Sequence, residues 1–164
     1  MVAVAKQVGE RRYRESVGRF YEEFAVGDIY EHRPGRTITE TENTWFTLLT
    51  MNKHPLHFDA EFAATTRLGR LVVQGGLTTS LFNALVAMRL PGPGSVFLHQ
   101  EWDYPAPVYV GDTVTAEAEV IEARSDKPIT RLRCVARRQD GTEVLRGECL
   151  VYTMRPDDPS RSVG

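Results

Sequence analysis

The stretch that decides the fold is GGLTTSLFNALVAMRL, residues 75–90. Its apolar residues recur with the helical period, and Phe82 and Val86 widen the apolar surface almost to the full circumference. Prolines and glycines directly after Leu90 stop the helix. A helix that is apolar nearly all round is typical of a core element, so we expect one long helix inside the domain.

The chain after this helix has the pattern of β-strands. Apolar and polar residues alternate weakly in the first of four segments and clearly in the other three. Strands are therefore expected over residues 95–103, 113–121, 130–138 and 143–154. Asp140-Gly141 is a strong hairpin signal, and an earlier turn is expected at Pro34-Gly35. The predicted fold class is α+β, a single domain with an antiparallel sheet covering a long helix.

The chain before the core helix combines a shorter helix with a turn. Thr39, followed by acidic residues, predicts a helix start, and an apolar face then recurs at helical spacing. This face consists of Trp45, Leu48, Leu49 and finally Asn52. Pro55 prevents continuation of the helix, so His57 is expected in a turn just beyond it. A second, short helix is expected after a cap at Asp59.

Length and composition bound the function. The chain has 164 residues, 41% of them apolar and 26% charged, which suits one globular domain. A net charge of −2 gives no basic surface for nucleic acid, and no apolar run is long enough to span a bilayer. Cys134 and Cys149 are expected to be buried and reduced, in a cytoplasmic protein without a signal peptide. We expect a flexible arm over residues 1–18, the domain over 19–154 and a disordered tail over 155–164.

Three segments together resemble the MaoC-like hydratase family, which includes the R-specific enoyl-CoA hydratases. They are NKHPLHFD at residues 52–59, GRLVVQGGLT at 69–78 and PVYVGDT at 107–113. The resemblance runs from Gly18 to Tyr152, with order and spacing kept. It implies a hot-dog fold, in which an antiparallel sheet wraps a long helix, two protomers pair their sheets, and acyl-CoA thioesters bind in the groove.

The resemblance identifies His57 as the counterpart of the family's catalytic histidine. Three positions depart from the family pattern. Asn52 stands where the catalytic aspartate is expected, His54 replaces an asparagine before Pro55, and Gln74 replaces a histidine before the long helix. Asn52 has no useful basicity and can only orient water, so His57 would act as both base and acid. His54 either takes over part of the missing role or only packs beside the proline.

The remaining candidates surround the start of the long helix. The amide of Gly75 or Gly76 lies at a positive helix end and is a candidate donor to the thioester oxygen, unless the pair only forms a tight turn. Gln74 is a candidate contact to the acyl group or to water. Arg67 and Arg70 are either ligands for a carboxylate or CoA phosphates, or solvated loop charges.

The predicted function is a hydro-lyase that hydrates and dehydrates a short enoyl-CoA reversibly. The pattern resembles a branch acting on branched or dicarboxylic C5 substrates such as itaconyl-CoA or mesaconyl-CoA. A hot-dog thioesterase is an alternative, although residues 77–90 carry no Asp or Glu to activate water. A weakly active or non-catalytic acyl-CoA-binding subunit is another, because Asn52 cannot act as an acid. His54 and His57 lack a third ligand, so no metal or other cofactor is expected. The expected assembly is a homodimer or an oligomer of dimers, with no nucleic-acid or membrane partner.

Overall fold

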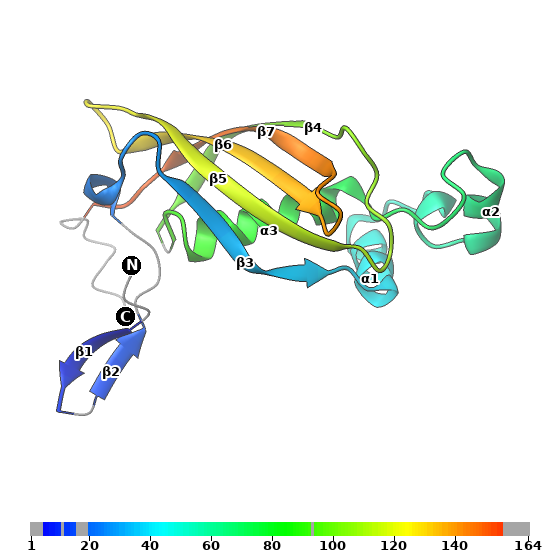
Figure 1. Cartoon of the computed structure of the whole chain (residues 1–164), viewed down its shortest axis with the longest axis horizontal. Helices are drawn as coiled ribbons and strands as arrows, with labels where there is room; N and C mark the ends of the chain where they lie inside the picture. Colours follow the sequence, from blue (N-terminus) through cyan, green and yellow to red (C-terminus); the bar gives the residue numbers. More distant parts are fainter. Residues whose placement is uncertain (1–4, 11, 16–19, 93, 156–164) are drawn as a thin grey trace.

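The computed structural model describes residues 5–10, 12–15, 20–92 and 94–155. Its main sheet has five antiparallel strands in the order β3-β5-β6-β7-β4 (Figure 1). Their bounds are β3 Ile29–Thr37, β4 Val96–Asp103, β5 Thr113–Ala123, β6 Ile129–Arg138 and β7 Glu143–Tyr152. Asp140-Gly141 connects β6 to β7, as predicted, with Gly141 at a φ of 85°. The predicted α+β class is confirmed.

The long helix α3 (Gly75–Met88) lies against one face of this sheet (Figure 1). Its buried side chains are Leu77, Thr78, Leu81, Phe82, Leu85 and Val86. The opposite side of α3 is exposed, including Asn83 and Met88, so the prediction that the helix is buried nearly all round is wrong. A single sheet covers only one side of a helix, and hydrophobicity alone does not reveal which side stays open.

Helix α1 (Glu40–Thr50) starts as predicted. The Thr39 hydroxyl accepts from the amide of Glu42, and the Glu42 carboxylate accepts from the amide of Thr39, which makes a capping box. The apolar face points outward instead of into the core: Trp45, Leu48 and Leu49 are 66%, 65% and 77% exposed. The buried residues of α1 are the polar Asn43 and Thr47. Tertiary hydrogen bonds therefore decide how α1 is oriented.

Two short helical turns follow α1. The 3₁₀ turn η2 (Pro55–His57) begins with proline, and α2 (Ala60–Thr65) is capped by the Asp59 carboxylate, which accepts from the amide of Phe62 at 2.9 Å. Both elements agree with the predicted turn and the short helix. Figure 1 shows α1 and α2 at one end of the molecule, beyond the end of the sheet.

The turn predicted at Pro34-Gly35 is wrong, because β3 runs through both residues. The strand lies at the sheet edge, where a proline without an N–H is tolerated, and its pairing with β5 shifts between His32 and Arg36. Gly35 allows this close approach, because a Cβ there would stand 2.8 Å from a methyl group of Thr115. The proline and glycine therefore make an irregularity in the strand.

The two ends of the chain were expected to form a flexible arm and a disordered tail. Strands β1 (Ala5–Gly9) and β2 (Arg12–Glu15) pair antiparallel, which the sequence did not predict, and Figure 1 draws them apart from the main sheet. The 3₁₀ turn η1 (Tyr21–Glu23) precedes β3. Residues 1–4, 11 and 16–18 of the predicted arm and 156–164 of the predicted tail lie outside the described residues. The division into arm, domain and tail stays a prediction.

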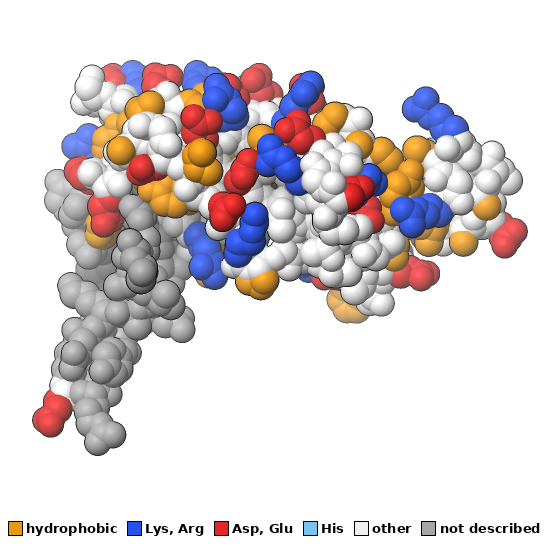
Figure 2. Space-filling view, viewed as in Figure 1, with side chains coloured by type: hydrophobic (Ala, Val, Ile, Leu, Met, Phe, Trp, Pro, Cys, Tyr) orange, Lys and Arg blue, Asp and Glu red, His pale blue; other side chains and the backbone are white. Residues whose placement is uncertain are grey.

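The outer face of the sheet is charged. Figure 2 shows acidic and basic side chains side by side over this face. Cross-strand ion pairs join Arg131 to Glu148, Arg133 to Glu119 and Arg137 to Glu143. Exposed pairs of this kind each contribute about 0–1 kcal/mol to the stability of the fold. Their main effect is therefore to keep this face of the sheet polar. Within the described part of the chain, no helix has the length and apolar character required to cross a bilayer.

Candidate active site

A tight turn after α1 presents His57. The helix ends at Met51, whose φ of 57° is left-handed. The Asn52 side-chain oxygen accepts from the amide of His54 at 3.3 Å, and the Nδ1 atom of His54 accepts from the amide of Leu56 at 3.2 Å. Asn52 and His54 are both exposed. Two of the predicted site residues therefore build the turn that carries the third.

The imidazole of His57 is held in one tautomer. Its Nδ1 lies 2.9 Å from the carbonyl oxygen of Val72. A carbonyl can only accept, so Nδ1 carries the proton and the Nε2 of the neutral ring has a free lone pair. His57 is half-buried, and its ring centroid is 6.0 Å from that of His54. This arrangement makes Nε2 available as a base.

Asn43 ties together the three segments around His57. It is fully buried, and its amide nitrogen donates to the carbonyl of His57 at 2.7 Å and to that of Val72 at 3.2 Å. Its side-chain oxygen accepts from the amide of Gln74 at 2.9 Å. The sequence prediction missed Asn43. The sequence did contain one signal for it, because Asn43 is an uncharged polar residue on the side of α1 opposite the apolar face.

The start of α3 offers free backbone amides. The amide of Gln74 binds Asn43, and that of Leu77 turns back to the carbonyl of Gln74 at 2.9 Å. Among the described residues, neither the Gly75 nor the Gly76 amide has a hydrogen-bond acceptor. Both lie at the positive end of the helix dipole, where an oxyanion is stabilised.

The same two glycines accommodate aromatic rings. A Cβ on Gly75 would stand 2.9 Å from the ring of Tyr104, and one on Gly76 would stand 2.9 Å from the ring of Phe46. Close packing therefore explains the glycine pair without any ligand, while the free amides suit an oxyanion. The two explanations are compatible, because packing uses the Cα side of each residue and an oxyanion would use the amide.

The remaining predicted contacts are Gln74, Arg67 and Arg70. The carboxamide of Gln74 is buried and donates to the Thr50 hydroxyl at 3.1 Å. Arg67 and Arg70 are exposed, and neither forms an ion pair within the described ranges. The Arg70 guanidinium lies 3.9 Å from the ring centroid of Tyr109. That stacking positions Arg70, whereas among the described residues Arg67 has no such ring contact.

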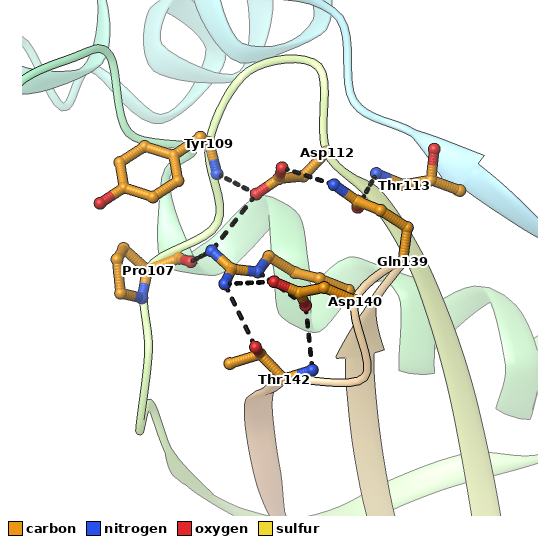
Figure 3. Close-up of polar contacts among 8 residues, drawn as sticks. Pro107, Tyr109, Asp112, Thr113, Gln139, Asp140 and Thr142 are labelled. Atoms are coloured by element: carbon orange, nitrogen blue, oxygen red, sulfur yellow. Dashed lines mark hydrogen bonds and ion pairs between the residues drawn. The ribbon is translucent and has the colours of Figure 1, made fainter.

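A polar network braces the segment that carries Tyr109 and Asp112 (Figure 3). The Asp112 carboxylate accepts from the amide of Tyr109 at 2.9 Å and from the Gln139 side chain at 3.1 Å, and lies 3.8 Å from the Arg138 guanidinium. Tyr109 forms a β-bridge with Val72, whose carbonyl binds His57. Asp112 therefore supports the position of His57 through two intermediate residues. Throughout the described residues, no three His, Cys, Asp or Glu side chains gather as a metal site.

Comparison with known proteins assigns the family. The family described as "MaoC like domain" matches residues 22–143. An (R)-specific enoyl-CoA hydratase from Aeromonas caviae is 45% identical over 106 residues, which are 65% of this chain and 79% of that protein. The solved structure of the A. caviae (R)-hydratase, described as involved in PHA biosynthesis, has a TM-score of 0.77 and 38% identity over 81% of this chain and 99% of its own. A mesaconyl-CoA hydratase from Cereibacter sphaeroides is 35% identical over 133 residues, 77% of this chain but only 37% of that longer protein. The hot-dog fold expected from the sequence is confirmed, and the chain belongs to the MaoC-like domain family.

Proposed function

We propose that this protein is a hydro-lyase that adds water reversibly to the double bond of a short enoyl-CoA thioester. One observation carries the proposal: the Nδ1–H of His57 is bound by Val72, so its Nε2 can accept a proton. The free amides at the start of α3 suit an enolate oxygen. Relatives named as an (R)-specific enoyl-CoA hydratase and a mesaconyl-CoA hydratase support the same reaction class.

The reaction assigns a role to each group. Nε2 of His57 takes a proton from water as the water oxygen bonds to the β-carbon, and the electrons of the double bond move to the thioester as an enolate. The amides of Gly75 and Gly76 donate to the enolate oxygen. Protonated His57 then delivers the proton to the α-carbon, which regenerates the thioester and the neutral ring. Asn52 orients the water but transfers no proton.

The substrate is proposed to be a C5 enoyl-CoA of the itaconyl or mesaconyl type. Arg70 supports a carboxylate on the acyl group, because its guanidinium is held on Tyr109 and lacks an acidic partner within the described ranges. Arg67 is proposed as a second contact to the same carboxylate or to CoA phosphates. His54 and Gln74 would contact the acyl group.

An assay with matched substrates tests the activity and the substrate class together. Purified protein is given crotonyl-CoA and mesaconyl-CoA, and loss of the conjugated thioester absorbance is followed. We expect both to be hydrated, with the larger kcat/KM for the dicarboxylic substrate. No hydration of any C4 to C6 enoyl-CoA would remove the hydratase proposal. Binding without turnover would instead favour the non-catalytic subunit, the alternative that Asn52 motivates.

The assembly is proposed to be a homodimer formed through β4. Among the described strands β4 pairs only with β7, and Val96 and Leu98 on it are 56% and 53% exposed. The opposite edge, β3, carries Pro34, which discourages pairing. Sedimentation of the wild type and a Val96→Lys variant tests this, with a shift towards monomer expected. Buried, free Cys134 and Cys149 fit the proposed cytoplasmic location.

A further inference from the structure

The hydroxyl of Thr47 is buried and has no hydrogen-bond partner. Thr47 is 3% exposed, and its Oγ1 finds no donor or acceptor within the described ranges. Thr50, on the same helix, donates to the carbonyl of Phe46 at 2.8 Å, the usual bond for a helical threonine. A buried polar group without a partner is destabilising, so the orientation of the Thr47 hydroxyl requires an explanation.

Contacts on either side place Thr47 against the first turn of α3. Asn43, one turn earlier on α1, binds the backbone amide of Gln74 at 2.9 Å. Thr50, about one turn later, binds the side chain of the same Gln74 at 3.1 Å. Residues three or four apart share a helix face, so Thr47 lies between these two contacts. The adjacent Phe46 ring lies against Gly76, which locates this part of α1 beside the free amides.

We propose that the Thr47 hydroxyl is a third donor to the thioester oxygen, beside the amides of Gly75 and Gly76. This inference rests on the proposed hydratase function. A hydroxyl that rotates freely and is already desolvated gains a partner when negative charge develops on that oxygen, so its contribution is larger in the transition state than in the free enzyme. Thr130 has an equally buried hydroxyl without a partner among the described residues, but it lies on β6, paired with Ala123 and Val151, and not on α1.

The test compares wild type, Thr47→Val, Thr47→Ser and Thr130→Val. Thr47→Val keeps the shape and removes the donor, so kcat and kcat/KM should fall together by about 10²-fold while the melting temperature does not fall. Thr47→Ser should recover most of the rate, and Thr130→Val should turn over as the wild type does.

The outcomes separate this proposal from the function on which it rests. Equal rates for wild type and Thr47→Val would overturn the role of Thr47 and leave the hydratase function standing. An equal loss in Thr47→Val and Thr130→Val would also overturn it, because general repacking would then explain both. A wild type that is inactive on every enoyl-CoA would overturn both proposals.

Discussion

The Nδ1 atom of His57 lies 2.9 Å from the carbonyl oxygen of Val72, which determines the tautomer of the ring. If His57 is the base and the acid, His57→Ala should lower kcat by about 10²- to 10⁴-fold. His57→Asn keeps an amide that can donate to Val72 but supplies no base, so it should be equally slow. Circular dichroism melting of each variant checks that the fold survives. A rate close to that of the wild type in either variant would exclude His57 from the chemistry.

Asn43 should stabilise the fold around His57. Asn43→Ala leaves the amide of Gln74 and the carbonyl of His57 without their partner in a fully buried place, which should cost about 3 kcal/mol of unfolding free energy. Urea denaturation measures this. Asn43→Asp keeps the acceptor for Gln74 but turns a carboxylate oxygen toward two carbonyls, so it should also be destabilised. If Asn43→Ala unfolds at the wild-type urea concentration, these three bonds do not support the site.

Asn52→Asp tests whether the native site lacks an acid. Either side chain accepts from the amide of His54, so the turn should persist. The new carboxylate could share the proton transfer with His57, and kcat should rise by about tenfold or more. Asn52→Ala removes the water contact and should lower kcat instead. A slower Asn52→Asp enzyme would indicate that the amide itself is required, which makes the native asparagine a specialised feature rather than a weakened one.

Because of the capping box of α1, the free energy of unfolding should depend on pH in the acidic range. Hydrogen bonds from Arg36 and from the backbone of Thr39 lower the pKa of Glu42 from 4.5 to about 2. The folded state therefore binds fewer protons than the unfolded state, and the stability from this carboxylate is present above pH 4.5 and is lost as the pH falls towards 2. Glu42→Gln should flatten the dependence of unfolding free energy on pH in that window.

Glu40 supplies a matched control for the capping box. It lies in the same first turn of α1, and within the described ranges its side chain forms no hydrogen bond or ion pair. Glu40→Gln should therefore leave the slope of stability against pH as in the wild type. Equal slopes for the Glu40 and Glu42 variants would mean that the bonds to Arg36 and Thr39 contribute nothing in solution.

Local chemistry made α1 predictable, but tertiary contacts decided its orientation. The cap at Thr39 and the stop before Pro55 depend on backbone hydrogen bonding over a few residues, and both were predicted. The outward orientation of Trp45 depends on Asn43, whose three partners come from segments 14 to 31 residues away. The resemblance located the turn of His57 and the start of α3. It did not show that Asn52 and His54 form the turn, or that Thr47 is buried without a partner for its hydroxyl among the described residues.

The glycine pair gives the last prediction, because the two residues meet different rings. Alanine at either position gains up to about 1 kcal/mol of helix propensity but brings a Cβ to 2.9 Å from an aromatic ring. Tyr104 is 52% exposed and can move away, so Gly75→Ala should keep its melting temperature. Phe46, on α1, is half-buried and its ring lies against the start of α3, so Gly76→Ala should melt lower. Adding Phe46→Leu to Gly76→Ala should recover part of the loss. If Gly76→Ala is as stable as Gly75→Ala, ring packing does not require the second glycine, and close approach of a substrate to its amide becomes the better explanation.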